Sequence, residues 1–331
     1  MPLEDAHNDP PRPLAPNAAA ARGDRPDWAI VIVVVAPGQG SQTPGFLEPW
    51  LELDGARDRL ESLGDAAGLD LVALGTTADA DAIRRTDVAQ PLIVAAGLLT
   101  AGALERPVTA VAGHSVGEIT AAVVAGVLDD GDGMRFIAAR GRAMAEAASR
   151  TPTGMSAVLG GDEAEVVARL ESLGLVPANR NGGGQIVASG ALEALETLKA
   201  EPPAGARVIP LQVAGAFHSE YMRPATDELR AFAATLSPAD PAARLWTNRD
   251  GGEVTSGAAY LDLLVGQVAS PVRWDRCMES FLEAGITGLV ELAPAGTLTG
   301  LARRGLKGVP TVAVKTPADL AAARELLDRT A

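Results

Sequence analysis

Apolar and polar positions divide this chain into segments with two different periods. Residues 29–36 form an unbroken, mostly β-branched run, AIVIVVVA, which ends at Pro37 and a glycine-rich stretch. A strand that is apolar on both faces belongs in the middle of a covered sheet, so this run predicts a central parallel strand. Segments with the 3.6-residue period of helices follow at 50–64, 87–105, 116–128 and 129–148, with a short strand at 108–115.

The middle of the chain has shorter segments in a different order. Strands are expected at 155–161, 175–181, 184–190 and 206–213, and helices at 162–174 and 191–200. Asp162 stands at the start of the first of these helices, where aspartate favours the N-terminus. This β-α-β-β-α-β order is typical of the ferredoxin-like arrangement. We therefore expect residues 152–213 to form a small domain inserted into a larger one.

The larger domain takes the remaining segments, 28–151 and 214–331. After the insert, a helix is expected at 221–236, strands at 243–248, 288–296 and 309–315, and a last helix at 317–330. Strands that alternate with helices indicate an α/β fold with a parallel sheet. The predicted fold class is α/β, with a larger α/β-hydrolase-like domain and a small inserted ferredoxin-like domain.

Residues 1–27 differ in composition from the rest. They are rich in Pro, Ala, Asp and Arg and contain no hydrophobic stretch, so they do not match a signal peptide. Because such a segment buries too little apolar surface to offset chain entropy, we expect a disordered tail. We hypothesise that this tail is dispensable, or that translation starts near Val31, and mass spectrometry of the natural N-terminus would decide.

Composition narrows the class of protein. The chain of 331 residues has a single cysteine, Cys277, which rules out an intramolecular disulfide framework or a thiolate metal cluster and fits a reducing cytoplasm. No eighteen apolar residues follow one another, so a membrane span is not expected. The formal net charge of −14 argues against nucleic acid as a partner, because phosphate binding needs a basic surface.

One motif suggests nucleophilic chemistry. The stretch VAGHSVGEIT places Ser115 in a G-x-S-x-G pattern after a predicted strand, typical of a turn that lifts a serine hydroxyl clear of a sheet. Such a hydroxyl needs a base. Of the three histidines, His7 lies in the tail and His114 is the serine's own neighbour, where side chains diverge on a sharp turn. His218 remains as the candidate base, with a buried structural histidine as the alternative.

The glycine-rich stretch APGQGSQ, residues 36–42, follows the predicted central strand. Such a turn can direct backbone N–H groups toward a point above the sheet edge, where the oxyanion of an acyl-transfer intermediate needs donors. A tight turn without chemistry is the alternative. A phosphate cradle is a further one, although neither G-x-G-x-x-G nor G-x-x-x-x-G-K-[ST] is present.

Six blocks together resemble a known family. PGQGSQ, GHSVGE, RGRAM, NRNGGGQIVASG, GAFH and GQVASPVRW occur in the order found in malonyl-CoA:acyl carrier protein transacylases. The resemblance runs from about Val31 to the C-terminus and is greatest to the actinobacterial enzymes of fatty acid synthesis and related polyketide acyltransferases. It implies that Ser115 is the nucleophile and that His218 is the general base and acid.

The resemblance also implies what surrounds this pair. It implies no carboxylate as third member; a backbone carbonyl at Gln267 orients the imidazole instead, and we see no obvious acidic partner near either block. The oxyanion hole would consist of the backbone N–H groups of Gln39 and Val116. The side chains of Gln39 and Gln267 would line the pocket, and Asn181 would contact substrate or support the structure.

Substrate choice would depend on Arg140 and Phe217. A guanidinium can hold the malonyl carboxylate with two parallel hydrogen bonds, and the resemblance assigns this role to Arg140. From the sequence alone a surface arginine is an equal alternative. Phe217 lies directly before His218. In related acyltransferases a phenylalanine at this position accompanies specificity for malonyl, because its ring would crowd the α-methyl group of a methylmalonyl substrate. Gly215 departs from the common H-A-F-H pattern, as in some transacylases of fatty acid synthesis.

The implied reaction is ping-pong transfer of malonyl from malonyl-CoA to the phosphopantetheine thiol of acyl carrier protein, by a cytoplasmic monomer without metal or redox cofactor. Arg303 and Arg304 are candidates for docking the acidic carrier protein, with a solvated helix face as the alternative. Three other functions stay open: a stand-alone polyketide synthase acyltransferase using malonyl or another extender, a serine esterase, and a non-enzymatic scaffold that binds carrier proteins.

Overall fold

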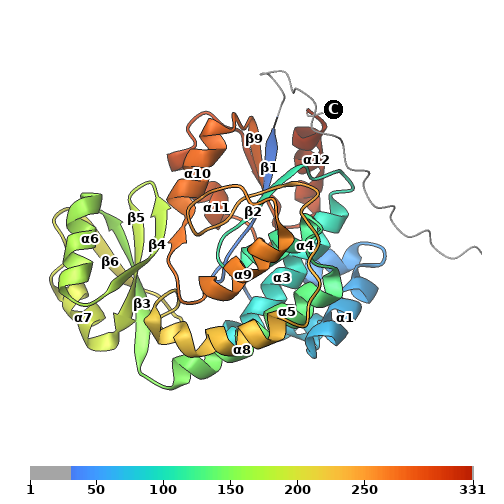
Figure 1. The fold of residues 1–331 in the computed structure, drawn as a ribbon. Helices are drawn as coiled ribbons and strands as arrows, with labels where there is room; N and C mark the ends of the chain where they lie inside the picture. The colour runs from blue at the N-terminus through green and yellow to red at the C-terminus, as the bar shows by residue number, and fades with distance from the viewer. Residues whose placement is uncertain (1–30, 330–331) are drawn as a thin grey trace, which may run out of the picture.

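The structure, a computed structural model, describes residues 31–329 and contains two β-sheets, each with helices packed against it (Figure 1). The predicted tail, residues 1–27, lies outside the described residues. The first sheet is parallel and five-stranded, in the order β10 (Thr311–Ala313), β9 (Gly288–Glu291), β1 (Ile32–Ala36), β2 (Ala110–Gly113) and β7 (Arg244–Leu245).

Strand β1 confirms the prediction of a central parallel strand. It pairs in parallel with β9 on one side and β2 on the other. Ile32 and Val34 contribute to the core on one face of the sheet, and Val33 and Val35 to the core on the other. A run that is apolar at every position is therefore required here, since both faces are covered.

Helices cover the two faces unequally. Most contribute to the larger core: α1 (Ala56–Ala67), α2 (Leu71–Thr76), α3 (Thr86–Ala103), α4 (Gly117–Val124), α5 (Asp130–Ser149), α8 (Arg223–Ala233), α9 (Gly257–Gln267) and α12 (Leu320–Asp328). The opposite face packs against α10 (Trp274–Glu283) and α11 (Thr297–Gly305). Helix α3 has the length and composition to cross a membrane, but 78% of it is buried inside the molecule, as in a core helix.

Some elements differ from the sequence prediction. The helix expected at 50–64 is broken: a 3₁₀ turn, Glu48–Glu52, precedes α1, and Gly55 between them has a left-handed backbone with φ of 73°. A glycine adopts this conformation without steric cost, so the chain changes direction there. Helices α9 and α10 were not predicted, and the strand expected at 243–248 is reduced to Arg244–Leu245.

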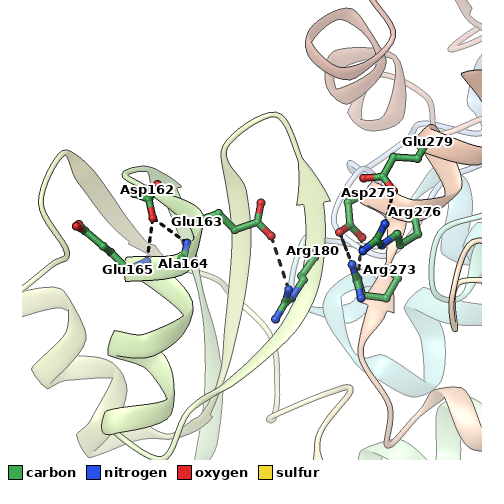
Figure 2. A network of polar contacts seen from close by, with 9 residues as sticks. All are labelled: Asp162, Glu163, Ala164, Glu165, Arg180, Arg273, Asp275, Arg276 and Glu279. Atoms are coloured by element: carbon green, nitrogen blue, oxygen red, sulfur yellow. Dashed lines mark hydrogen bonds and ion pairs between the residues drawn. The ribbon is translucent and has the colours of Figure 1, made fainter.

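The second sheet has the order β6 (Ala206–Pro210), β3 (Thr153–Gly160), β5 (Gln185–Ala191), β4 (Val176–Gly182) and β8 (Val272–Arg273). Its first four strands pair antiparallel with one another and occur, with α6 (Glu163–Ser172) and α7 (Leu192–Ala200), in the predicted β-α-β-β-α-β order. Both helices lie on the outer side (Figure 1). Asp162 accepts hydrogen bonds from the Ala164 and Glu165 amides at 3.0 and 3.1 Å, which confirms that it starts α6 (Figure 2).

The second sheet extends beyond the predicted insert. Its fifth strand, β8, comes from residues 272–273 and pairs in parallel with β4 through Asn179 and Val272. Residues from after the insert therefore continue the small sheet, and they join it to the larger part of the molecule. The carboxyl ends of β1 and β2 lie close to this junction. His114, directly after β2, donates its backbone N–H to Ala36 at the end of β1, and its side chain contacts Asn181 on β4.

Candidate active site

The turn between β2 and α4 carries Ser115. A Cβ added at Gly113 would lie 2.0 Å from the carbonyl carbon of Gly117, and one added at Gly117 would lie 2.1 Å from the carbonyl oxygen of Ala36. Both glycines of the G-x-S-x-G pattern are thus required by close backbone approach. Helix α4 starts at Gly117, two residues after the serine, so the short turn holds the hydroxyl at the edge of the parallel sheet.

Ser115 and His218 form a hydrogen-bonded pair. The distance from Ser115 Oγ to His218 Nε2 is 2.7 Å, and that from His218 Nδ1 to the backbone oxygen of Gln267 is 2.9 Å. Because a carbonyl only accepts, Nδ1 carries the proton and Nε2 is free to accept from the hydroxyl. Burial, with a smaller contribution from the charge of Arg140, lowers the pKa of His218 to about 3. The imidazole is therefore neutral at physiological pH.

His114, the neighbour of the serine, points elsewhere. Its Nε2 lies 2.8 Å from Asn181 Oδ1, and its ring packs edge-on against Trp274 at a centroid distance of 5.6 Å. Asn181 in turn donates to Gln185 Oε1 at 2.9 Å. His114 thus links the serine turn to the second sheet, and burial lowers its pKa.

Two backbone amides near the hydroxyl have no acceptor. Within residues 31–329, neither the Val116 nor the Gln39 N–H donates a hydrogen bond, and both residues line the same cavity as Ser115. The Ser115 amide is unavailable, because it donates to Asn248 Oδ1 at 2.7 Å. The Gln39 side chain turns toward the Arg84 carbonyl oxygen at 3.4 Å. The geometry is suited to an oxyanion that accepts from the two free amides.

Arg140, on α5, is completely buried. Its Nη1 donates to Gln90 Oε1 at 2.7 Å and its Nη2 to Gln267 Oε1 at 2.8 Å, while Nε has no partner among the described residues. Burial lowers the pKa of Arg140 to about 10, so the guanidinium stays charged at neutral pH. Among residues 31–329, its hydrogen-bond acceptors are thus two neutral amides. Arg142, two residues on, is exposed.

A cavity of about 210 Å³ connects these groups. Most of the predicted site residues lie on its wall: Gln39, Ser115, Val116, Asn181, Phe217 and His218. Arg140 and Gln267 do not line this cavity, but Gln90, which does, accepts a hydrogen bond from Arg140. Arg303 and Arg304 are apart from it, exposed on α11.

Sequence reasoning missed three residues that hold this site. Gln90 faces Arg140, and Asn248 contacts both sides of the serine turn, donating to the Gly113 carbonyl oxygen at 2.7 Å as well as accepting from Ser115. Asn248 was recognisable as a polar residue at the carboxyl end of a predicted strand, a usual place for functional side chains in α/β sheets. No comparable sequence signal marked Gln90.

The third missed residue, Glu118, is a buried acidic group close to the serine turn, although it is not an acidic partner of the histidine. Its side chain is 1% exposed and belongs to the GHSVGE block itself. Its Oε1 accepts from the backbone N–H of Asn248 at 2.6 Å, and its Oε2 contacts the side-chain nitrogen of Gln267. The carboxyl group does not contact His218. Burial raises the pKa of Glu118 to about 8, against the opposing effects of its N–H donors and Arg140.

Comparison with known proteins agrees with this site. Residues 33–322 match the family described as "Acyl transferase domain". The malonyl CoA-acyl carrier protein transacylase of Mycobacterium tuberculosis is 56% identical over 296 residues, which cover 88% of this chain and 98% of that protein.

Solved structures show the same fold. The crystal structure of the Mycobacterium tuberculosis enzyme superposes with a TM-score of 0.86, covering 90% of this chain and 99% of that one. A malonyl-transacylase in complex with its type II polyketide synthase acyl carrier protein is 30% identical, with a TM-score of 0.83 over 89% of this chain and 99% of that one. The chain belongs to the acyl transferase family and, within it, to the malonyl-CoA:acyl carrier protein transacylases.

Proposed function

We propose that this protein transfers malonyl from malonyl-CoA to the phosphopantetheine thiol of acyl carrier protein, through a malonyl ester on Ser115, for fatty acid biosynthesis. The observation that carries the proposal is the 2.7 Å pair of Ser115 and His218 beside a buried arginine. Gln267 joins the two, because its side chain contacts both Arg140 Nη2 and the Ser115 carbonyl oxygen.

The first half-reaction forms the ester. As Ser115 Oγ attacks the thioester carbonyl carbon, its proton passes to His218 Nε2, and the carbonyl oxygen becomes an oxyanion. The Gln39 and Val116 amides donate to that oxyanion. The carbon–sulfur bond then breaks, and His218 returns the proton to the sulfur of coenzyme A. The Gln267 carbonyl stabilises the imidazolium through Nδ1–H during the transfer.

The second half-reaction reverses these steps with another thiol. The carrier protein's phosphopantetheine thiol gives its proton to His218 Nε2 as the sulfur attacks the ester carbonyl carbon. The ester bond breaks, and Ser115 Oγ recovers its proton from His218. The two steps use this chain's side chains and two thiols, and the proposal includes no metal or redox cofactor.

Selectivity for malonyl is assigned to Arg140. Its two amide acceptors are neutral, so a carboxylate that displaces Gln90 gains a charge-assisted interaction with the guanidinium, which Gln267 continues to hold at Nη2. Gln90, on the cavity wall, would turn aside to admit the carboxylate. The Phe217 ring lies on the same wall and would crowd an α-methyl group. Asn181, also on this wall, would contact substrate or support the structure through its hydrogen bonds with His114 and Gln185.

Docking of the carrier protein is assigned to Arg303 and Arg304 of α11. In the described part of the chain neither forms an ion pair, and Arg304 lies against the turn at Gly183. The neighbouring arginines across a groove of about 370 Å³ are already neutralised, as Figure 2 shows: Arg180 by Glu163, Arg273 by Asp275 and Arg276 by Glu279. The unpaired charge for an acidic partner is thus on α11.

The finer structural predictions belong to the same proposal. The order β6–β3–β5–β4, with every neighbouring pair antiparallel, supports a ferredoxin-like domain at 152–213, and the parallel first sheet with its serine turn supports an α/β-hydrolase-like domain at 28–151 and 214–331. We further propose a monomer that acts in the cytoplasm and binds neither nucleic acid nor membrane.

A second pathway shares this chemistry. One of the structural relatives is bound to a type II polyketide synthase acyl carrier protein, so polyketide carrier proteins are a second candidate class of acceptor for this chain. The flanking genes and relative rates with the two kinds of carrier protein would distinguish them.

The proposal is tested with radiolabelled malonyl-CoA. The wild-type protein should acquire a base-labile malonyl adduct on Ser115 and pass it to added carrier protein, and the Ser115→Ala variant should do neither. An adduct that is released as free malonate, at a rate indifferent to carrier protein, would instead identify a serine esterase.

A further inference from the structure

Glu118 is a buried carboxyl group that the proposed steps do not use. It stands in the first turn of α4, where the helix favours an acidic side chain. Burial raises the pKa of this carboxyl group to about 8, and hydrogen bonds from N–H donors oppose that shift by satisfying its oxygens. The groups that compensate Glu118 lead to both halves of the active site.

The first connection leads to the nucleophile. Oε1 of Glu118 accepts from the backbone N–H of Asn248 at 2.6 Å. The Asn248 side chain accepts from the Ser115 amide and donates to the Gly113 carbonyl oxygen, each at 2.7 Å. Glu118 thereby holds the residue that clamps the serine turn from both sides.

The second connection leads to the arginine. Oε2 of Glu118 contacts the Gln267 side-chain nitrogen, and the oxygen of the same amide accepts from Arg140 Nη2 at 2.8 Å. An amide has a donor end and an acceptor end, so acceptors at Glu118 and at the Ser115 carbonyl oxygen, which lies 3.2 Å from the same nitrogen, leave the amide oxygen facing Arg140. The opposite orientation would set the NH₂ group of Gln267 against the guanidinium.

We propose that Glu118 is a positioning residue for malonyl selectivity: it fixes the amide orientation of Gln267, which in turn directs Arg140 toward the substrate carboxylate. This inference rests on the proposed function. Through Asn248 the same carboxyl supports the serine turn, which every acyl substrate uses. Loss of Glu118 therefore affects all acyl transfer in part, and malonyl transfer more.

A second cavity makes this proposal testable by chemical rescue. It has a volume of about 670 Å³, and Glu118 and Gln267 contribute to its wall together with exposed residues such as Arg249 and Asp262. The Ser115 side chain is on the wall of the other, smaller cavity. Removal of the Glu118 side chain would thus leave a space that a small carboxylate can enter without passing the active site.

The first measurement compares malonyl-CoA with acetyl-CoA as donors for the Glu118→Ala variant. We expect kcat/KM for malonyl to fall about 100-fold, as for a displaced substrate-binding group, and kcat/KM for acetyl to fall much less. The matched controls carry the same substitution at Glu291 (Glu291→Ala here, Glu291→Gln for Glu118→Gln), because Glu291 is also buried but accepts from the amides of Gly296, Leu298 and Thr299. Their malonyl-to-acetyl ratios should stay that of the wild type.

The second measurement adds formate to the Glu118→Ala variant, with chloride at equal ionic strength as control. Formate should restore malonyl transfer in this variant and not in Arg140→Ala. Equal losses for malonyl and acetyl, without rescue, would show a purely structural role and overturn the inference. The proposed function would survive that result as long as the wild type forms the Ser115 adduct.

Should Glu118→Ala fail to fold, Glu118→Gln decides. This variant keeps the side-chain volume but replaces one acceptor oxygen with an NH₂ donor. Because both oxygens of Glu118 face N–H donors, the NH₂ group would meet a donor at either position. A selective loss of malonyl transfer supports the proposal, and an unchanged malonyl-to-acetyl ratio in this variant refutes it.

Discussion

Ser115 and His218 share an unusual backbone conformation. They are two of only three non-glycine residues between 31 and 329 with positive φ, at 52° and 59°. Such a conformation costs about 1 to 3 kcal/mol and persists where surrounding contacts impose it. Here the Ser115 amide donates to Asn248 and the His218 amide to the Val268 carbonyl oxygen. The fold thus holds both side chains in position before any substrate binds.

At Arg140 we predict a change in selectivity. Arg140→Ala should lower kcat/KM for malonyl. The activation free energy should rise by about 2 to 5 kcal/mol, the usual effect of removing one partner of a buried charged hydrogen bond. Acetyl, which has no free carboxylate, should lose far less. Parallel assays with malonyl-CoA and acetyl-CoA measure this, with Arg140→Lys as the variant that keeps the charge. Comparable malonyl kinetics in Arg140→Ala would remove this residue from substrate binding.

At His218 we predict an unusual pH profile. Its pKa is lowered to about 3, so the imidazole stays neutral, and able to accept a proton, as the pH falls through 6.5. The rate of Ser115 acylation by malonyl-CoA should therefore stay nearly constant between about pH 7 and pH 5, below the pKa of about 8 at which Glu118 titrates. Rapid-quench acylation, with circular dichroism to confirm folding, measures it. A rate that halves near pH 6.5 would indicate a solvated imidazole instead.

At the scale of elements, the β2–turn–α4 unit depends on the absence of side chains at two positions. The strand, the turn and the helix approach so closely that Gly113 and Gly117 have backbone atoms where a Cβ would be. Close packing of this kind places the start of α4 directly against the end of β1. As a result, the Val116 amide and the glycine-rich turn after β1 face the same cavity.

We predict that Gly117→Ala destabilises the fold. The added Cβ would meet the Ala36 carbonyl oxygen at 2.1 Å, so the backbone must shift, at a cost of about 3 kcal/mol. Gly102→Ala is the control, because Gly102 lies in α3, is exposed and has no atom within 4 Å of an added Cβ. The control should gain about 0.5 to 1 kcal/mol. Urea unfolding of both variants tests this, and equal stabilities would contradict the packing argument.

At the scale of the whole molecule, the active site lies where two sheets meet. The first sheet supplies Ser115, the second supplies Asn181, and His114 spans the two. Strand β8, from the later part of the chain, completes the second sheet beside β4. The cleft wall is therefore built from both sheets, and α11 stands beside the turn that ends β4.

This arrangement predicts a carrier-specific effect on α11. The double variant Arg303→Glu and Arg304→Glu should raise the KM for acyl carrier protein and leave the KM for malonyl-CoA unchanged, since only the protein substrate reaches this exposed face. Arg57→Glu, at an exposed position of α1, is a charge-reversal control. Steady-state kinetics at two salt concentrations measures both, and an unchanged carrier KM would exclude α11 from docking.

The sequence by itself determined the features that depend on neighbouring residues. The apolar run of β1, the glycines around Ser115 and the cap at Asp162 each follow from local steric or hydrogen-bonding rules, and the order of elements follows from their periodicity. Elimination among three histidines and the order of six motifs singled out His218, which the structure places 2.7 Å from Ser115.

Only the tertiary structure decided which distant side chains share the buried network. The hydrophobic periodicity of the sequence did not predict α9, the helix that carries Gln267. It also could not predict that Glu118 contacts Gln267, which is 149 positions away in sequence. Whether Arg140 was a surface residue or a buried cation was likewise open until α5 packed against α3. The physical reason is that burial and hydrogen-bond partners of polar groups are properties of the folded chain, and no local pattern encodes them.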